Sequence, residues 1–542
     1  MFDFNGRTLT DARAQSFLDQ GVWTEESFID VLEHNVERYP ELIHKDEKQS
    51  LSYKELWDEV EAVSAHFYDL GLRKGDRIAL QLPNTLDYVI AIFGAARIGA
   101  VGVTLQIDLG RQAIIQSLEK SQAKAWIIAD SFRGESLYKM AQEIQQEVPG
   151  LTHLILQGDA SQAPEKTLTF ASLRTPTRQL AQSELETNRP GPLDAFLIVF
   201  TSGTTGEPKG VVHLHANYLW AARAYADNFE YQPGEGVLDV APISHQTGML
   251  AGVMMTIAKC GSILLLDRFS ATRVLNWIER DKPAYIIGAP PHVIHVANNP
   301  KLTSTDTSSV KLFIYAGASV PNAVLQNLQT EGGIKVGAMF GWSEGFVATA
   351  TRPNDSLEAI SSTVGFAVPG IEVRLVDDDG HDVEQGTPGE MWSRGPNFSP
   401  GYFENPEAAD RQWDKDGWFH SGDLLREDEN GRYSFVARAD DIINRGGTKV
   451  DPKHVEDAIA EHDSVETIAV VGTPHETLGQ QVVACVVLKE EAASFDLTEL
   501  NDFLAESGLA KFQFPDDLKL MDALPTTHSG KIKKKDLRET LQ

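Results

Sequence analysis

Short apolar runs alternate with longer stretches of helical periodicity along the middle of the chain, over residues 76–341. The runs at 77–82 and 125–129 have the length and composition of buried strands, whereas 85–98 and 135–147 carry apolar residues at the spacing of one helix face. Strands that alternate with helices in this way are typical of βα units around a parallel sheet. This first block therefore predicts a parallel sheet covered by helices.

A second block repeats the same alternation more densely. Helical stretches at 270–280 and 321–330 lie between short apolar runs, and another helical stretch covers 215–228. We predict a doubly wound α/β domain, built on one parallel sheet or on two packed together. The strands expected in this block are 195–200, 262–266, 284–288, 311–315 and 335–340.

The pattern changes after residue 363, where brief alternating segments are separated by Gly and Pro. Segments at 372–376, 389–394 and 433–436 have this character. Alternation of period two, broken by turn residues, is typical of antiparallel strands. We therefore predict a small antiparallel β subdomain that completes a large N-terminal domain over residues 1–439.

The last part of the chain, residues 440–542, predicts a second domain. It combines two helical patterns with two β-branched strands, enough for a compact α+β domain of about 100 residues. The elements expected here are helices at 452–462 and 497–507 and strands at 465–471 and 481–488.

Composition and charge narrow the class of protein. The 542 residues include 48 Lys plus Arg and 78 Asp plus Glu, a net charge of −30. This charge opposes non-specific binding to nucleic acid or to an anionic membrane, so we exclude nucleic-acid-binding proteins. The two cysteines, Cys260 and Cys485, are too few for a disulfide framework or a zinc site, which fits a reducing compartment.

The chain ends carry no visible targeting signal. The first residues lack a basic region followed by an apolar stretch, and no run reaches the 18 apolar residues of a spanning helix. The final Thr540-Leu541-Gln542 is neither a peroxisomal signal nor a prenylation box. We expect a cytoplasmic protein without a membrane span.

The sharpest chemical signal is the segment 200–210, Phe-Thr-Ser-Gly-Thr-Thr-Gly-Glu-Pro-Lys-Gly. Its glycines allow backbone N–H groups to turn toward an anion, its hydroxyls add donors, and Lys209 adds a positive charge. It differs from a Walker A loop because Glu207 and Pro208 separate Gly206 from the lysine. The segment therefore predicts a loop that holds a polyphosphate.

Further motifs follow this loop in a fixed order. They are 242–248 (Pro-Ile-Ser-His-Gln-Thr-Gly), 340–344 (Phe-Gly-Trp-Ser-Glu), 418–423 (Trp-Phe-His-Ser-Gly-Asp), 438–441 (Arg-Ala-Asp-Asp) and 525–531 (Pro-Thr-Thr-His-Ser-Gly-Lys). Together with the phosphate loop, this series resembles the adenylate-forming superfamily of acyl-CoA synthetases, aryl-acid AMP ligases, peptide-synthetase adenylation domains and luciferases. The resemblance runs from about Phe28 to Leu541.

The resemblance implies a two-step reaction with ATP and Mg²⁺. A carboxylate attacks the α-phosphate of ATP, pyrophosphate leaves, and a thiol captures the acyl-adenylate. Lys531 would bridge the carboxylate and the α-phosphate, while Glu344 and Thr201 would hold Mg²⁺. His245 would border the acyl pocket, so Lys531, His245 and Glu344 form the implied catalytic set.

The resemblance also implies the residues that bind ATP. Phe340 offers a ring for the adenine, and Asp423 can accept both ribose hydroxyls. The implied ATP-binding set is Thr201, Ser202, Gly203, Thr204, Thr205, Gly206, Lys209, Gly317, Ala318, Ser319, Phe340, Gly341, Trp342, Ser343, Asp423 and Arg438.

A mobile C-terminal domain follows from the same resemblance. Lys531 must approach for adenylation and withdraw for thiol capture, and the implied hinge is Asp440. Gly446 and Gly447 would then line the channel for the pantetheine of CoA. The implied acyl pocket contains His245, Gln246, Met249, Ala251 and Gly337, a mostly apolar set that suits a medium-chain, cyclic or other small hydrophobic acid.

Several alternatives remain open. An aryl-acid AMP ligase that loads a phosphopantetheine carrier protein shares much of this pattern, although such enzymes usually carry Asn where this chain has Gln246. The segment 341–345 also matches the Gly-x-Ser-x-Gly elbow of serine hydrolases, with His528 as a possible partner of Ser343, but no oxyanion motif precedes it. Luciferase-like oxidation is a more distant alternative.

Overall fold

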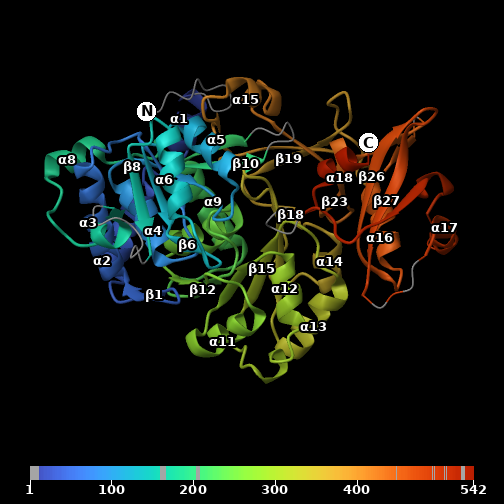
Figure 1. Cartoon of the computed structure of the whole chain (residues 1–542), viewed down its shortest axis with the longest axis horizontal. Coiled ribbons are helices and arrows are strands. Elements are labelled where there is room, and N and C mark those ends of the chain that lie inside the picture. The colour runs from blue at the N-terminus through green and yellow to red at the C-terminus, as the bar shows by residue number, and fades with distance from the viewer. Residues whose placement is uncertain are drawn as a thin grey trace. The chain divides into compact units, whose positions relative to one another are not determined.

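The computed structural model of the chain describes residues 11–158, 167–202, 208–446, 448–490, 492, 495–505, 507, 509–526 and 532–541. The chain divides into two compact units (Figure 1). The first comprises Met1–Glu372 and Ser393–Phe419, and the second comprises Val373–Trp392 and His420–Gln542. The domain boundary at Asp440 stays a prediction.

An eight-stranded sheet forms one half of the first unit. Its strand order is β21-β11-β10-β4-β3-β5-β8-β9, and the run from β10 to β9 is parallel. Strands β11 and β21 add an antiparallel edge. The bounds are β3 (Arg77–Gln81), β4 (Val101–Thr104), β5 (Ala125–Ala129), β8 (His153–Gln157), β9 (Leu168–Thr169), β10 (Ala195–Ser202), β11 (Pro208–Leu214) and β21 (Gly401–Tyr402).

A nine-stranded sheet forms the other half of this unit. Its order is β18-β17-β16-β15-β14-β12-β13-β1-β2, with parallel pairing from β16 to β1 and antiparallel pairs at both ends. The bounds are β1 (Ile43–Lys45), β2 (Ser50–Ser52), β12 (Gly236–Asp239), β13 (Ser262–Leu265), β14 (Tyr285–Gly288), β15 (Leu312–Ala316), β16 (Val336–Phe340), β17 (Thr349–Ala350) and β18 (Phe366–Ala367).

Helices between the two sheets share one apolar core with both of them. Ile127 of β5 and Ile263 of β13 belong to this core, whereas the next residues along these strands, Ile128 and Leu264, pack on the outer faces. Strands buried on both faces read as continuous apolar runs, which is why the sequence pattern located them. The helices that share the core include α2 (Phe28–Arg38), α3 (Tyr53–Asp69), α4 (Leu86–Arg97), α9 (His215–Asn228) and α10 (Met255–Ala258).

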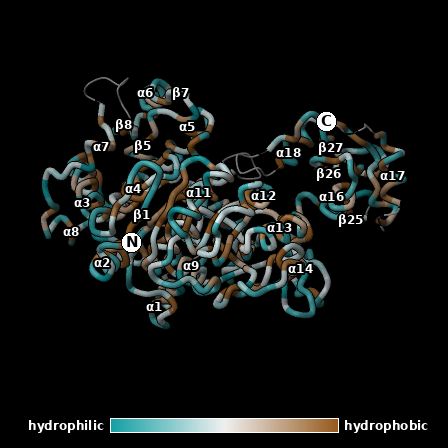
Figure 2. Tube along the Cα trace, turned by 90° about the horizontal axis from the view of Figure 1, so that it is seen from below, coloured by the Kyte–Doolittle hydropathy of each residue, from teal (hydrophilic) through white to brown (hydrophobic). Residues whose placement is uncertain are grey.

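Other helices cover the outer faces of the two sheets. On the eight-stranded sheet these are α5 (Arg111–Ser121) and α6 (Tyr138–Glu147). The nine-stranded sheet carries α11 (Ala271–Asp281), α12 (Pro290–Ala297) and α13 (Asn322–Gly332), which lie together on one side of β15 in Figure 1. In Figure 2, the surface helix α8 (Gln182–Asn188) is coloured mainly as hydrophilic, whereas the colour of the interior segments is mainly hydrophobic. The layers therefore run helix, sheet, helix, sheet, helix.

The second unit contains a five-stranded sheet and part of a four-stranded one. The four-stranded sheet has the order β19-β20-β22-β23, and its β22–β23 pair is antiparallel. The five-stranded sheet has the order β25-β24-β27-β26, with β28 parallel to β27. The bounds are β19 (Glu372–Val376), β20 (Gly389–Arg394), β22 (Phe419–Glu427), β23 (Tyr433–Arg438), β24 (Ile443–Arg445), β25 (Thr448–Val450), β26 (Val465–His475), β27 (Gly479–Leu488) and β28 (Asp517–Leu520).

The remaining α-helices and the π-helix are short or lie at the ends of the units. In the first unit they are α1 (Asp11–Asp19), α7 (Phe170–Leu173), the π-helix η2 (Thr247–Met254), α14 (Leu357–Ser362) and α15 (Pro406–Gln412). In the second unit they are α16 (Pro452–Ala460), α17 (Leu497–Ala505) and α18 (Lys534–Thr540). No helix among the residues the structure describes is long and apolar enough to cross a bilayer.

The predicted fold class is confirmed: the chain is α/β, with two helix-covered parallel sheets, a small β-sheet and an α+β C-terminal region. Two local expectations were wrong, and several strands were not expected. The strand at 195–200 joins the first block, because Leu197 of β10 pairs with Gly102 of β4. The helix expected from residue 135 begins at Tyr138, because β6 (Ser131–Phe132) and β7 (Glu135–Ser136) form a hairpin. Strand β11 was not expected at all.

His44 provides a test of this packing. Its side chain is fully buried on β1, where Nδ1 accepts a hydrogen bond from the Ile263 N–H at 3.1 Å and the ring lies 4.2 Å from that of Tyr53. Burial lowers the pKa of His44 from 6.5 to about 3. Between these values the unfolded chain binds a proton that the folded chain does not, so stability falls as pH falls through this window.

We therefore expect His44→Gln to lose less stability than the wild type on acidification. The slope of the free energy of unfolding against pH between 6.5 and 4.5 should decrease by up to about 1.4 kcal/mol per pH unit, the value for one proton. Urea midpoints of both proteins measure this slope. His34→Gln, at an exposed histidine, is the control, and parallel slopes for His44→Gln and the wild type would contradict a neutral buried His44.

Candidate active site

The phosphate motif, residues 200–210, has its two described ends on the paired antiparallel strands β10 and β11. Thr201 pairs with Lys209, and Ser202 pairs with Pro208. Both ends of the motif are thereby held by the edge of the eight-stranded sheet. The predicted residues Gly203, Thr204, Thr205 and Gly206 lie outside the described residues, so their contacts with a nucleotide stay predictions.

The segment that carries Glu344 is a tight turn after β16. A Cβ atom at Gly341 would lie 1.9 Å from the Phe346 carbonyl oxygen, so a larger residue does not fit there. Phe346 itself has φ = 59°, in the left-handed region that non-glycine residues rarely adopt. Its ring stacks on His213 with 4.2 Å between ring centroids. The turn is thus held in an unusual conformation by packing.

A buried polar network holds the backbone of this turn. The Asn217 side chain donates to Nδ1 of His213 at 3.2 Å and to the Asn397 carbonyl at 3.0 Å. Burial lowers the pKa of His213 to about 3, so its ring is neutral. Because Nδ1 accepts a hydrogen bond, Nε2 carries the proton and donates to the Ser343 carbonyl at 2.9 Å. Asn397 donates in turn to the Gly345 carbonyl.

Glu344 is partly exposed, and its carboxylate meets a buried tyrosine. The Tyr402 hydroxyl donates to Glu344 Oε1 at 2.7 Å. Burial is the main cause that raises the pKa of Tyr402, and the Glu344 charge adds to it. The hydroxyl therefore stays a donor over the whole physiological range.

The aromatic residues beside Glu344 pack on one another. The Phe340 and Trp342 rings lie 5.3 Å apart at 78°, and Trp342 also lies 5.2 Å from Phe419. Trp342 thus belongs to the edge of a hydrophobic cluster, and its expected contact with the nucleotide stays a prediction. Gly317, Ala318 and Ser319 follow β15 as an exposed segment, and Gly317 has φ = 108°.

Asp423 and Arg438 come together in the second unit. They are partners in the β22–β23 register, and Arg438 Nε lies 3.1 Å from Asp423 Oδ1. Asp423 is buried, whereas Arg438 remains partly exposed. The guanidinium therefore orients the carboxylate that is expected to accept the ribose hydroxyls.

The segment with His245 follows β12 and is held from the eight-stranded half of the unit. Asn84 Nδ2 donates to the Ala241 carbonyl at 2.7 Å, and Asn84 Oδ1 accepts from the Ile243 N–H at 2.9 Å. These bonds fix the backbone on both sides of Pro242. Asn84 was not singled out in the sequence, because an Asn before a helix reads as an ordinary turn residue.

Four of the five predicted acyl-pocket residues lie on or just before the π-helix η2. His245 is exposed, and its Nδ1 accepts the Thr247 N–H at 3.3 Å. Gln246 is buried: its Oε1 accepts a hydrogen bond from Tyr218 at 2.5 Å, while its Nε2 finds no partner among the described residues. Met249 and Ala251 are buried on η2, and Gly337 is buried on β16.

Two glycines let η2 approach the end of β12. A Cβ atom at Gly252 would lie 2.1 Å from Asp239 Oδ2, and one at Gly248 would lie 2.5 Å from the Pro242 carbonyl oxygen. Burial raises the pKa of Asp239 well above its usual value. π-Helical turns occur frequently at functional sites, and sequence periodicity gave no sign of this one.

The expected hinge and CoA channel lie in the second unit. Asp440 is exposed in a 3₁₀ turn, Ala439–Asp441, and Asp441 pairs with Arg538 of α18. Gly446 has φ = 62° and donates its N–H to the Leu478 carbonyl at 2.7 Å. Gly447 and Lys531 lie outside the described residues. Thr526 and Ile532, on either side of the segment 527–531, form a β-bridge.

Comparisons with known proteins show the family of this chain. The profile of the AMP-binding enzyme family matches residues 32–403, and that of the AMP-binding enzyme C-terminal domain matches residues 454–531. The chain belongs to the AMP-binding enzyme family. It is an adenylate-forming ligase, which confirms the resemblance stated from the motifs.

Relatives within the AMP-binding enzymes cover nearly the whole chain. The medium-chain fatty-acid–CoA ligase of Escherichia coli (strain K12) is 31% identical over 98% of this chain and 94% of its own length. The 2,3-dihydroxybenzoate-AMP ligase of Bacillus subtilis (strain 168) is 28% identical over 98% of this chain and 96% of its own. The structure of ATP-bound MatB from Rhodopseudomonas palustris has a TM-score of 0.85 and 25% identity, covering 95% and 99% of the two chains.

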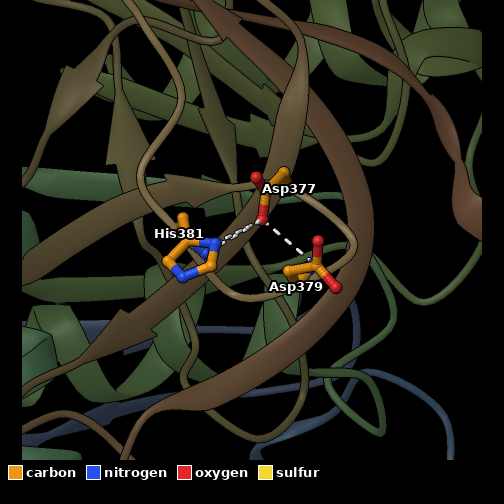
Figure 3. Close-up of side chains that lie close together, drawn as sticks. All are labelled: Asp377, Asp379 and His381. Carbon is orange, nitrogen blue, oxygen red and sulfur yellow. Dashed lines mark hydrogen bonds and ion pairs between the residues drawn. The ribbon is translucent and has the colours of Figure 1, made fainter.

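The second unit also contains an exposed acidic cluster. Asp377, Asp379 and His381 are exposed and offer ligand atoms within 4.8 Å of one another (Figure 3). Asp377 Oδ1 accepts the backbone N–H groups of Asp379 at 3.0 Å and of His381 at 2.9 Å. These bonds close the turn after β19 in the manner of an Asx turn, and they explain the arrangement of the three side chains.

Asn84→Ala tests whether the hydrogen bonds of Asn84 hold the segment that carries His245 in this AMP-binding enzyme. Loss of both hydrogen bonds should destabilise the protein by about 1–3 kcal/mol and, by loosening the segment, raise the KM for the acid about tenfold. Asn327→Ala is the control, because Asn327 makes a comparable bond to the Ala297 carbonyl at 2.6 Å between α13 and α12. An unchanged KM with the same loss of stability in both variants would refute the positioning role.

Proposed function

We propose that this adenylate-forming ligase is an ATP-dependent carboxylic acid:CoA ligase. It joins a medium-chain, cyclic or other small hydrophobic acid to AMP with release of pyrophosphate, and then transfers the acyl group to CoA with release of AMP. The observation that carries the proposal is the full-length similarity to the medium-chain fatty-acid–CoA ligase, at 31% identity. A mostly apolar set of expected pocket residues supports a hydrophobic acid.

The residues of the first step must oppose the repulsion between two anions. Two lysines supply the positive charge. Lys209, on β11, faces the phosphates, and Lys531 bridges the α-phosphate and the attacking carboxylate. Glu344, a partly exposed carboxylate beside a hydroxyl donor, is a hard oxygen ligand of the kind that Mg²⁺ takes. When bound, Mg²⁺ neutralises charge on the phosphates, with Glu344 and Thr201 as the residues that would hold it.

The residues of the second step lie in the C-terminal part of the chain. After adenylation, a turn at Asp440 would carry Lys531 away and bring Gly446 and Gly447 to the thiol. Asp440 is exposed in a single 3₁₀ turn between two strands, which suits a residue that changes its backbone dihedrals. Glycines at the channel leave room for the pantetheine arm.

The second candidate is an aryl-acid AMP ligase that passes the acyl group to a phosphopantetheine carrier protein. The 28% identity to 2,3-dihydroxybenzoate-AMP ligase over 98% of the chain favours it. Gln246 argues against a dihydroxybenzoate substrate, because its side chain is one methylene longer than the Asn that is usual at this position. The two candidates share the first step and differ in the thiol.

Product analysis distinguishes the two candidates. Purified protein is incubated with ATP, Mg²⁺, CoA and single acids from an aliphatic, cyclic, aromatic and thioether panel, and the products are identified by mass spectrometry. We expect acyl-CoA and AMP in equal amounts with a hydrophobic aliphatic or cyclic acid. Acyl-adenylate that accumulates without acyl-CoA, but disappears on addition of a phosphopantetheinylated carrier protein, would instead establish the second candidate.

Lys531→Ala and Asp440→Pro separate the two half-reactions. Loss of the bridging cation should slow adenylation by at least about 100-fold, whereas thiolysis of a supplied acyl-adenylate should persist. Proline at the hinge should have the opposite effect, because its fixed φ opposes the rotation. Pyrophosphate exchange and acyl-CoA formation measure the two steps. Lys535→Ala, at an exposed lysine nearby, is the control, and equal loss in both steps would contradict the assignment.

A further inference from the structure

Tyr402 connects two motifs that lie about 130 residues apart in the sequence. It stands on β21, the edge strand of the eight-stranded sheet, where Tyr402 pairs with Val211 and Gly401 pairs with Val212 of β11. The residue is 5% exposed. Its hydroxyl donates a hydrogen bond to Glu344 Oε1 at 2.7 Å. This buried side chain thus contacts the carboxylate that is expected to hold Mg²⁺.

The ring of the same tyrosine meets the lysine of the phosphate motif. Lys209 Nζ lies 5.3 Å from the centroid of the Tyr402 ring, within the range of a cation–π contact. Lys209 is paired with Thr201 across the hairpin, so its backbone is fixed. The Tyr402 side chain therefore contacts both the ammonium group of Lys209 and the carboxylate of Glu344.

Backbone bonds around Tyr402 hold both motifs to the same segment. The Ser399 N–H donates to the Glu344 carbonyl at 2.7 Å, and the Phe403 N–H donates to the Gly210 carbonyl at 2.7 Å. The segment 399–403 thus binds the backbone of the Glu344 turn at one end and the backbone of the phosphate hairpin at the other. Tyr402 lies between these two anchors, so its own position is well defined.

We infer that Tyr402 is a positioning residue for adenylation, which orients the Glu344 carboxylate relative to Lys209. The hydroxyl fixes one carboxylate oxygen and hence the plane of the group, and the ring sets the distance to the ammonium group. The inference rests on the proposed role of Glu344 as the carboxylate that holds Mg²⁺. Partners that orient a metal-binding carboxylate typically affect metal affinity or activity by about 10–100-fold when they are removed.

Tyr402→Phe tests the inference, because it removes the hydroxyl and keeps the ring. In the full-length protein we expect kcat of acid-dependent pyrophosphate exchange to fall about 10–100-fold, with little change in the KM for the acid. The Mg²⁺ concentration for half-maximal exchange should rise. Thiolysis of a supplied acyl-adenylate should be unchanged, since this step does not require the Mg²⁺ that Glu344 would hold at the ATP phosphates.

Metal binding is also measured without turnover. Mn²⁺ titrated into the protein with a non-hydrolysable ATP analogue, followed by electron paramagnetic resonance, should bind more weakly to Tyr402→Phe than to the wild type. Tyr53→Phe is the matched control: Tyr53 is fully buried and donates to the Gly261 carbonyl at 3.0 Å, away from the motifs. Melting temperatures of both variants report any general loss of stability.

A double-mutant cycle with Glu344→Gln shows whether Tyr402 acts through Glu344. We expect Tyr402→Phe to have little further effect on exchange once Glu344 is replaced, because coupled residues are non-additive. Full additivity, an unchanged Mg²⁺ or Mn²⁺ dependence, or equal losses in Tyr402→Phe and Tyr53→Phe would overturn the inference. A wild-type protein that forms no adenylate with any acid would instead refute the proposed function.

Discussion

Strand β11 hydrogen-bonds to β10 along one edge and to β21 along the other, and these two ladders set the relative positions of the described ends of the phosphate motif and of Tyr402. The Tyr402 hydroxyl and the Ser399 N–H then hold Glu344. The segment 203–206 is expected to bind polyphosphate, and such a loop needs fixed ends, since its N–H groups must all point toward the same anion. Antiparallel pairing of Thr201 with Lys209 meets this need. The β21 ladder then brings residues about 190 positions later in the chain beside the same hairpin.

Burial of neutral polar groups is the second feature that shapes this site. His213, Asn217 and Asn397 are buried, and together they supply hydrogen bonds to the backbone of the Glu344 turn. A charged side chain at these buried positions would be destabilised by desolvation. A buried polar group without a hydrogen-bond partner would lose the bonds that it makes to water in the unfolded chain. A neutral histidine that accepts at Nδ1 and donates at Nε2 avoids both costs. The partly exposed Glu344 is thereby held by a rigid and uncharged support.

Much of the parallel-sheet architecture was predictable because its strands are buried on both faces. The run 125–129 coincides with β5, and the helical pattern 215–228 coincides with α9. Prediction failed where the deciding interaction was a distant one. Strand β11 pairs with its neighbour β10 but also with β21, about 190 residues later in the chain, and η2 forms a π-helix where Gly252 packs on Asp239 of another element, β12. No local pattern contains these partners.

The sequence by itself determined the class of fold, the order of the motifs and the residue types that adenylate chemistry needs. Those features depend on hydrophobic periodicity and on short motifs such as 200–210, which are local. Only the tertiary structure decided which other residues support the chemistry. Asn84, His213 and Tyr402 act through hydrogen bonds to segments between about 58 and 160 residues away, and such pairs are set by sheet order and by packing between layers.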